Sequence, residues 1–299
     1  MPVLDAVLIA VAVLALLGVI FEEVIHVNKA KTTLFFGTLS WVLLFLFSVS
    51  PDETAAVSAG LSESIAEIAG LWLFLVAAMT FVAYLNKKGM IENMIYLIMP
   101  RQVTERRLLF LTGLFCFVFS SLADNITATL VSCSLILSLN LELKKRLQFI
   151  VLVVFAVNSG GVSLITGDVT TLMIFLADKV EILTLLTLAI PASITVFILA
   201  VLLSRGLDGT VSLKGSSNEV RKVDAVIAAL FLITIIGTIT GNALFSVPPV
   251  LTFLFGLSIM FLVSRFMSDD SDLDPILEYI RVIEFETLLF FLGILLLVG

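Results

Sequence analysis

Two clusters of polar residues interrupt long apolar stretches of this sequence, and each contains an acid that could do chemistry. The first cluster is FSSLADNITATL at 119–130, and the second is VNSGGVSLITGDVTT at 157–171. A carboxylate in the middle of a bilayer costs about 2.5 kcal/mol or more even on the lenient insertion scale, so it normally faces a cavity, a partner or a substrate. The candidate site residues are Asp124, Asn125, Thr127, Asn158, Ser159, Asp168 and Thr171.

The acids in these clusters could hold either a proton or a small cation. Their neighbours offer hydroxyl, amide and freed carbonyl oxygens, which are hard ligands that suit Na⁺ or Li⁺. Desolvation raises the pKa of a carboxyl group, and a bound cation lowers it again. Because proton and cation then compete for one site, we expect Asp124 and Asp168 to accept both H⁺ and Na⁺. The other candidates would supply oxygen ligands or shape the two clusters.

Helix capping is the alternative role for the same residues. Asp124 or Asn125 could cap the helix that follows the first cluster, and Asp168 could cap a helix that begins near Thr170, because Asp and Asn are favoured N-caps. An exposed loop could supply such a cap without burying an acid, so the sequence favours ion binding. The two roles can also coexist.

The composition places both clusters in a membrane protein. Apolar residues make up 60% of the 299 residues, charged residues only 14%, and the mean hydropathy is +1.18. Such values exclude an ordinary soluble domain, and several runs approach the roughly 20 apolar residues that a transmembrane helix needs. We therefore expect an all-α polytopic membrane protein. The predicted apolar spans are 3–21, 33–49, 68–85, 108–140, 147–177, 182–203, 224–245, 248–266 and 287–299.

The charges that flank 108–140 predict that this segment is a re-entrant hairpin. Five Lys or Arg residues precede it between 87 and 107, and three follow it between 144 and 146. Under the positive-inside rule both flanks are cytoplasmic, so the segment would enter and leave on one side, with its turn near the first cluster. Residues 50–66, expected to form an external loop, carry acids without a cation. The N-terminus is then predicted to be external to a bacterial inner membrane.

The segment 147–177 is predicted to be a discontinuous helix. Gly160 and Gly161, followed by Gly167, weaken a helix and permit another backbone to approach closely.

Cys116 and Cys133 lie in apolar segments and match neither metal-site nor redox spacing, so we expect them to serve packing.

An internal repeat with one constant offset organises the chain. Asp5 in VLDAVLIA matches Asp224 in VDAVIAA, Gly37 in TLFFG matches Gly256 in TFLFG, and Glu67 matches Glu286. The offsets 224 − 5, 256 − 37 and 286 − 67 all equal 219. Both aspartates lie near predicted helix starts, where they would stabilise the helix dipole.

The repeat also predicts the domain organisation. Residues 1–204 would form a first repeat with five crossings plus the hairpin, 205–222 a cytoplasmic linker, and 223–299 an incomplete second repeat. Because the first repeat crosses an odd number of times, the second must insert upside down, as in inverted-repeat transporters. The second copy stops inside its third helix, so we expect a second hairpin to follow Gly299.

Four segments of the sequence resemble the NhaD-type sodium/proton antiporters of the ion transporter superfamily, which also contains arsenite and dicarboxylate permeases. The segments are FEEVIHVNKAKTTLFFGTLSW, SSLADNITATL, VNSGGVSLITGDVTT and EFETLLFFLGILLLVG, and they follow the family's order. The resemblance implies exchange of Na⁺, or Li⁺, for H⁺ across the inner membrane. It also implies that a hairpin tip and a broken helix from each repeat form the site.

An anion or organic-acid permease on the same architecture is the main alternative. In the dicarboxylate branch the corresponding tips resemble neutral Ser-Asn-Thr patterns, whereas Asp124 and Asp168 occupy those neighbourhoods in this sequence, which favours a cation. A membrane enzyme is disfavoured because the sequence has no His-rich metal motif and no nucleophile elbow. We expect no cofactor besides the transported ions. The expected partners are the lipid bilayer and small cations but no nucleic acid, and a homodimer stays open.

Overall fold

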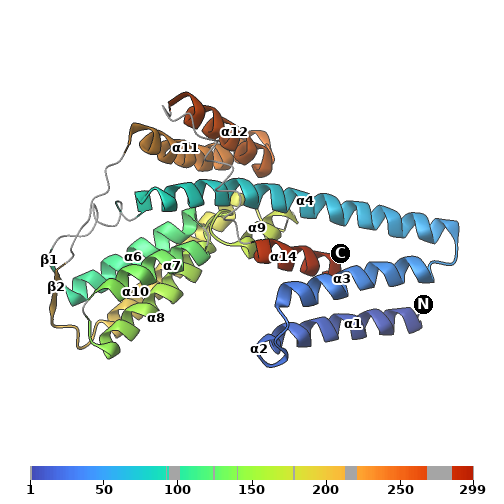
Figure 1. Ribbon diagram of the computed structural model, residues 1–299, viewed down its shortest axis with the longest axis horizontal. Coiled ribbons are helices and arrows are strands. Elements are labelled where there is room, and N and C mark those ends of the chain that lie inside the picture. Colours follow the sequence, from blue (N-terminus) through green and yellow to red (C-terminus); the bar gives the residue numbers. More distant parts are fainter. Residues whose placement is uncertain are drawn as a thin grey trace. The chain divides into compact units, whose positions relative to one another are not determined.

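The chain is helical apart from one pair of short strands. The computed structural model describes residues 2–91, 93, 102–123, 125–139, 141–177, 179–212, 221–267 and 285–298 (Figure 1). Two compact units divide the chain: unit 1 consists of Met1–Trp72 and Glu284–Gly299, and unit 2 consists of Leu73–Ile283.

Unit 1 is built around α3 (Lys29–Phe47), which packs against both α1 (Pro2–Ile20) and α14 (Phe285–Val298). The short α2 (Glu22–Ile25) connects α1 to α3. Asn28 begins α3 as an N-cap, because its side chain accepts a hydrogen bond from the Ala30 amide at 2.8 Å. The same unit contains the first part of the long helix α4 (Pro51–Lys87).

Glycines bring α3 and α14 into close contact inside unit 1. A methyl group at Gly37 would lie 2.7 Å from the Gly293 carbonyl oxygen, and one at Gly293 would overlap the backbone of α3. The indole of Trp41 donates a hydrogen bond to the Leu296 carbonyl at 2.9 Å, and the indole of Trp72 donates to the Leu288 carbonyl at 3.0 Å. Small residues at a crossing with polar contacts around it are typical of helix packing in membranes.

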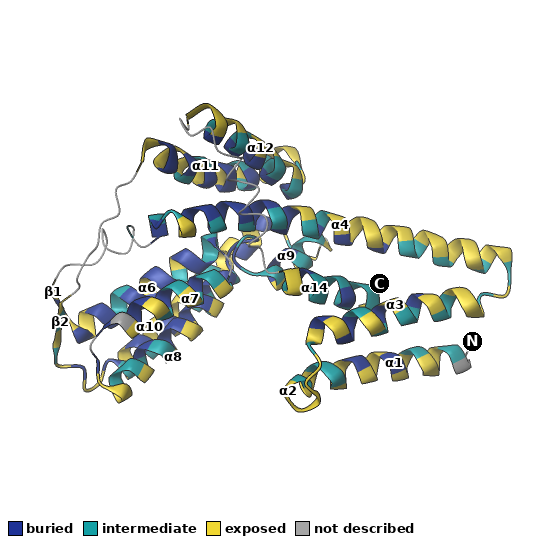
Figure 2. Ribbon diagram, in the orientation of Figure 1, coloured by how far each residue is buried: buried dark blue, intermediate teal, exposed yellow. Residues whose placement is uncertain are grey.

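The expectation of a loop at 50–66 was wrong, because α4 begins at Pro51 and continues for 37 residues. Ser50 and Glu53 form a capping box: the Glu53 amide donates to the Ser50 hydroxyl at 3.2 Å, and the Glu53 carboxylate accepts from the Ser50 amide at 3.4 Å. Pro51 occupies the first helical position, where its missing N–H costs nothing. The polar composition that suggested a loop reflects an exposed helix face, which Figure 2 shows in the first half of α4.

Unit 2 contains the helices that carry both polar clusters. In Figure 1, α6, α7, α8 and α10 lie side by side, and α6 packs against α8 and α10 while α7 packs against α8. The core between them includes Phe149, Leu152, Val153 and Ala156, all fully buried. The elements are β1 (Gln102–Thr104), α6 (Glu105–Leu122), α7 (Asn125–Ser138), α8 (Leu143–Gly161), α9 (Val169–Leu176), α10 (Ile182–Leu203), β2 (Thr210–Ser212), α11 (Lys222–Phe245) and α12 (Pro249–Met267).

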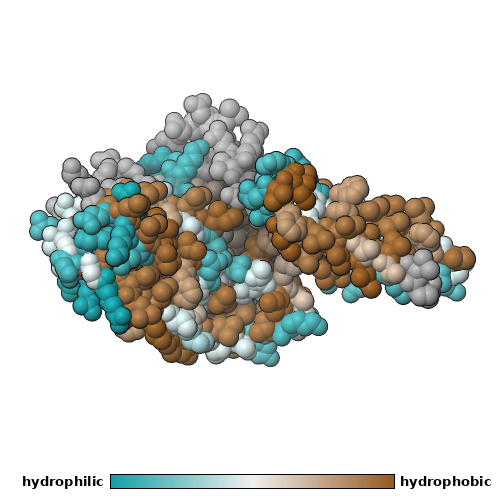
Figure 3. Space-filling model, turned by 90° about the horizontal axis from the view of Figure 1, so that it is seen from below, coloured by the Kyte–Doolittle hydropathy of each residue, from teal (hydrophilic) through white to brown (hydrophobic). Residues whose placement is uncertain are grey.

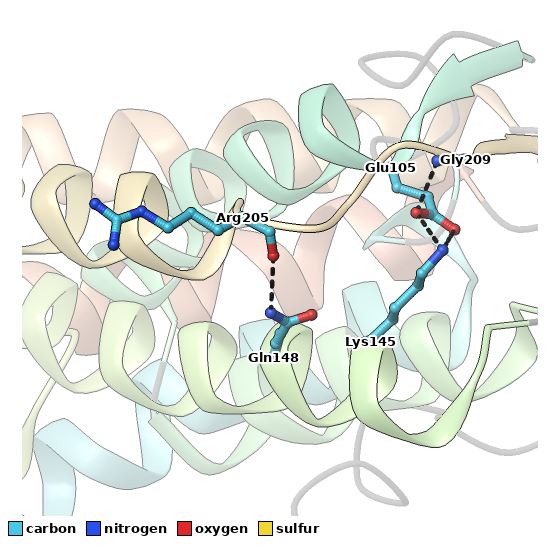
Figure 4. Close-up of polar contacts among 5 residues, drawn as sticks. All are labelled: Glu105, Lys145, Gln148, Arg205 and Gly209. Carbon is cyan, nitrogen blue, oxygen red and sulfur yellow. Dashed lines mark hydrogen bonds and ion pairs between the residues drawn. The ribbon is translucent and has the colours of Figure 1, made fainter.

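Glu105 joins three segments at one end of this bundle (Figure 4). Its buried carboxylate binds the Lys145 ammonium at 2.8 and 2.9 Å and accepts a hydrogen bond from the Gly209 amide at 3.0 Å. The Glu105 amide in turn donates to the Gly209 carbonyl at 2.9 Å, next to the antiparallel pairing of β1 with β2. A methyl group at Gly209 would lie 2.5 Å from the carboxylate. The starts of α6 and α8 and the segment after α10 are therefore held together.

The second half of α4 packs against α11 and α12. The rings of Phe74 and Phe253 are 4.6 Å apart, and Phe81 stacks on Phe231 at 5.2 Å. These aromatic contacts lie entirely inside unit 2.

Asp224 lies in the first turn of α11, as predicted, but its buried ion pair was not predicted. Its carboxylate accepts a hydrogen bond from the Tyr84 hydroxyl at 2.6 Å and pairs with Arg221 at 3.2 Å. The pKa of the nearby Lys88 is lowered below its ordinary value. The larger cause is burial of its ammonium group, and the second is repulsion from Arg221. Asp5, its counterpart in the first repeat, is exposed in the first turn of α1. The contact ties the end of α4 to the start of α11.

The surface is that of a multi-pass membrane protein. Large apolar side chains are exposed along most of the described helices, and apolar residues cover much of the face shown in Figure 3. Among the described residues, five helices are long and apolar enough to cross a bilayer: Lys29–Phe47, Pro51–Lys87, Ile182–Leu203, Lys222–Phe245 and Pro249–Met267.

We predict that Gly37→Ala destabilises the protein, because the added methyl group would press on the α14 backbone at 2.7 Å. Overpacking of this kind costs about 1–3 kcal/mol. Gly70→Ala is the matched control, since nothing lies within 4 Å of its added methyl group. Thermal unfolding in detergent should show a lower midpoint for Gly37→Ala and an unchanged or higher one for Gly70→Ala. Equal midpoints for the two variants would contradict the close crossing.

Candidate functional site

The first polar cluster forms the turn between α6 and α7. α6 ends at Leu122, Ala123 is extended (φ −118°, ψ 162°), and α7 begins at Asn125. Asp124, one of the two predicted ion-binding acids, lies outside the described residues. α7 has 14 residues and is therefore about 21 Å long, which is shorter than the roughly 30 Å of bilayer hydrocarbon.

The second polar cluster interrupts the helix, as the glycines predicted. α8 ends at Gly161, and α9 begins only at Val169. Asp168 is the N-cap of α9: its carboxylate accepts hydrogen bonds from the Thr170 amide at 3.3 Å and from the Thr170 hydroxyl. The capping role weighed for Asp168 is therefore present. Each carboxylate oxygen accepts one of these bonds, so lone pairs are left for another ligand.

Three glycines, which have no side chain, allow the turn between α6 and α7 to contact the interrupted helix. A methyl group at Gly160 would overlap the Phe117 carbonyl, and one at Gly167 would overlap the Ser120 carbonyl. A methyl group at Gly161 would overlap the side-chain amide of Asn125. The three glycines therefore act as the sites of close approach between α6, the start of α7 and the interrupted helix.

Hydrogen bonds fix the same contact. The Ser120 hydroxyl lies 2.7 Å from both the Asn125 amide oxygen and the Val157 carbonyl oxygen. The Thr166 hydroxyl donates to the Ser121 carbonyl at 2.8 Å. The two clusters, which are about 40 residues apart in the sequence, thus form one polar node.

The structure places the predicted ligands differently with respect to this node. Asn125 belongs to it directly. Asn158 does not, because its side chain is exposed and its amide donates to the Val154 carbonyl of its own helix at 2.8 Å. Thr171 is buried in the first turn of α9, whereas Ser159 and Thr127 are half-buried on α8 and α7.

Sequence reasoning did not select three hydroxyl residues that the structure places at the node. Ser120 and Thr166 make the hydrogen bonds that join the clusters. Ser163 lies in the interruption, 3% exposed, and its hydroxyl has no hydrogen-bond partner among the described residues. All three occur inside the clusters seen in the sequence, but nothing in the spacing ranked them above their neighbours.

The node offers hard oxygen ligands and one described carboxylate. Hydroxyl, amide and carboxylate oxygens suit small hard cations. Among the described residues no three His, Cys, Asp or Glu side chains come together, so this part of the chain offers no ligand set for a transition metal. The unpartnered Ser163 hydroxyl is one such oxygen with a free lone pair.

Comparison with known proteins shows one family over nearly the whole chain. The model of the family described as Citrate transporter (CitMHS) matches residues 3–299. The Na(+)/H(+) antiporter NhaD of Alkalimonas amylolytica is 29% identical over 97% of this chain, and NhaD of Vibrio cholerae serotype O1 is 27% identical over 94%. Sodium/proton antiporter 1 of Arabidopsis thaliana is 26% identical over 94%. The resemblance to NhaD-type antiporters is thereby confirmed.

The chain is shorter than these relatives. It spans 66% of the Alkalimonas protein, 65% of the Vibrio protein and 50% of the Arabidopsis protein.

We predict that Gly161→Ala and substitutions of Asn125 are energetically coupled. The methyl group of Gly161→Ala would overlap the Asn125 amide, so this variant should unfold at a lower temperature. Asn125→Ala removes the overlapped group. The double variant should therefore be more stable than the sum of the two single effects allows.

Gly237→Ala supplies the control for this cycle, because its methyl group would meet only Thr252 at an ordinary distance of 3.8 Å. It should show no coupling with Asn125→Ala. Strict additivity for the Gly161 and Asn125 pair would argue against the contact between turn and interruption.

Proposed function

Because this chain belongs to the citrate transporter family, we propose that it works as a secondary transporter that exchanges Na⁺ or Li⁺ for H⁺ across a bacterial inner membrane. The observation that carries the proposal is the polar node, in which the hairpin turn meets a broken helix capped by Asp168. Relatives named as sodium/proton antiporters support the choice of ions.

The composition of the node favours a cation over citrate. Citrate carries several negative charges and would need cationic or hydrogen-bond-donating ligands. Neither polar cluster contains Lys, Arg or His, and each contains an aspartate. A carboxylate at Asp168 would repel a citrate carboxylate in a site of low dielectric constant. The family description alone therefore does not decide the substrate.

Competition at the acids would couple the two fluxes. Na⁺ binds to the ionised carboxylate together with neutral oxygens, and a proton converts the same carboxylate into a neutral acid. In this proposal Asp124 and Asp168 accept H⁺ or Na⁺, while the Asn125 amide and the Ser163 hydroxyl offer neutral oxygens. Ser120 and Thr166 keep the two halves of the node together.

Corresponding helix contacts in the two units support the inverted repeat. The offset of 219 makes α12 the counterpart of α3, and α14 the counterpart of α4 from Glu67 onward. In unit 1, α3 packs against α14, and in unit 2 the second half of α4 contacts α12 through Phe74 and Phe253. Within each unit, the second long helix of one repeat thus contacts the third of the other.

A second pair of contacts corresponds to within one residue. A methyl group at Gly18 would meet Thr32 at 2.5 Å, between α1 and α3. One at Gly237, which is 219 residues after Gly18, would meet Thr252 at 3.8 Å, between α11 and α12. The glycines correspond under the offset of 219 and their threonine partners differ by 220, so the first two long helices of each repeat cross at positions that match to within one residue.

The lengths of α6 and α7 support a re-entrant hairpin. With 18 and 14 residues they are about 27 and 21 Å long, so neither reaches fully across about 30 Å of hydrocarbon. The cationic residues on both flanks favour entry and exit on the cytoplasmic side, with the N-terminus outside. Alternating access would then move the hairpin-bearing helices against the first helices of each repeat.

Replacing each acid by its amide tests the proposal. We expect Asp168→Asn and Asp124→Asn to abolish Na⁺-induced proton release from inverted vesicles containing the full-length protein, because an amide does not take up a proton at neutral pH. Asn is as good an N-cap as Asp, so Asp168→Asn should leave the start of α9 and the unfolding temperature intact. Asp5→Asn, at an exposed helix start, is the matched control.

Two results would count against this function. Undiminished exchange in both acid variants would remove the acids from the mechanism. Saturable uptake of labelled citrate that does not depend on Asp168 would favour the organic-acid permease instead.

A further inference from the structure

Buried polar side chains line one face of α6, from the polar node at Ser120 towards the N-terminal end of the helix. Thr112, Cys116 and Ser120 follow one another at intervals of four residues, so they lie on the same face of the helix. Ser132 of α7 lies beside the Cys116 thiol. All four residues are at most 1% exposed. They form a polar line inside the hairpin, in the part of the chain that is predicted to be surrounded by lipid.

Two hydroxyls of the polar line have no oxygen or nitrogen partner. Thr112 Oγ1 is buried and has no hydrogen-bond partner among the described residues, and the buried Ser132 Oγ meets there only the Cys116 thiol, a weak hydrogen-bonding group. Leaving a buried hydroxyl unpaired costs about 1–3 kcal/mol, and most buried polar groups in proteins are paired. Other buried threonines of this chain avoid that cost by donating to the carbonyl four residues earlier, at 2.6 to 2.8 Å: Thr80, Thr234 and Thr238.

We propose that the polar line binds water and conducts protons between the polar node and the Glu105 end of the hairpin. This inference rests on the proposed proton exchange and assigns that exchange a route. Residues four apart on a helix are about 6 Å apart along its axis, and one water with two hydrogen bonds of about 2.8 Å spans nearly that distance. Hydroxyls and water both donate and accept, as a chain of proton transfers requires.

The Ser120 end of the polar line belongs to the polar node. The Ser120 hydroxyl contacts Asn125, next to Asp124 in the chain. The Ser120 carbonyl lies where a methyl group at Gly167 would be, next to Asp168. A protonated carboxyl group would pass its proton to the first water, and each water would pass on a different proton. The carboxylate is left ionised and one proton emerges at the other end.

Apolar side chains close the polar line at its Thr112 end. Leu108 and Leu109 are fully buried in the turn of α6 below Thr112. Glu105 lies seven residues before Thr112, about 10 Å along the helix. An antiporter needs such a barrier, because a continuous water line to an acid that is accessible from the opposite side would leak protons. In the arrangement that the structure shows, the two leucines close the route, and in this proposal protons pass to the Glu105 end only when alternating access moves the leucines apart.

Two conservative variants test this route in the full-length protein reconstituted into liposomes. Thr112→Val and Ser132→Ala remove these two hydroxyls with little change in shape, and Ser134→Ala, at an exposed position two residues along α7, is the matched control. We expect each variant of the line to slow Na⁺-driven proton flux by about tenfold. Exchange of radioactive for unlabelled Na⁺ moves no proton and should continue at the wild-type rate, as should both fluxes in Ser134→Ala.

The pair of assays separates the possible outcomes. Equal loss of both fluxes would show a structural role for the hydroxyls and overturn the route, and so would wild-type rates in both. A wild-type protein that exchanges Na⁺ for Na⁺ but moves no protons would overturn the proposed function and the route with it. Thermal unfolding provides an independent test: removing dry, unpaired hydroxyls should raise the unfolding temperature, whereas removing hydroxyls that hold water should not.

Discussion

The close backbone contact between the hairpin turn and the interrupted helix is the constraint on which the site depends. Three glycines make it possible, because a methyl group at Gly160, Gly161 or Gly167 would overlap the opposing segment. Each segment alone would expose unpaired backbone groups, which a bilayer does not satisfy. Together they pair those groups with hydroxyls such as Ser120 and Thr166. The interrupted backbone is therefore stabilised at the place where the two polar clusters meet.

Much of this arrangement could be predicted from the sequence because polar residues at bilayer depth have few physical explanations. The glycines of 157–171 indicated an interruption, and the structure has one between Gly161 and Val169. The resemblance to NhaD-type antiporters, carried by the same residues, is confirmed by the relatives. The expected re-entrance and inverted repeat stay proposals, and Asp124 lies outside the described residues.

What could not be predicted depends on contacts between distant residues. The capping box at Ser50 and Glu53 converts a polar stretch into an exposed helix, although its acids alone suggested a loop. Glu105 joins the segments because its carboxylate accepts a hydrogen bond from Gly209, which is 104 residues away in the sequence. The two strands beside this contact have three residues each and are too short to give a periodic signal. Ser120 was one hydroxyl among many in its cluster, and only the fold shows that it bridges Asn125 and α8.

In the proposed mechanism, capping and ion exchange at Asp168 would support one another. Thr170 binds both carboxylate oxygens, through its amide and its hydroxyl, so the carboxylate is oriented before any ion arrives. Such preorganisation lowers the cost of binding a cation. A cation bound to the remaining lone pairs of the Asp168 carboxylate leaves both hydrogen bonds from Thr170 in place. A proton on one carboxylate oxygen instead weakens the hydrogen bond that this oxygen accepts. The two competing ions would therefore differ in how firmly they hold the first turn of α9, which links occupancy of the acid to the local backbone.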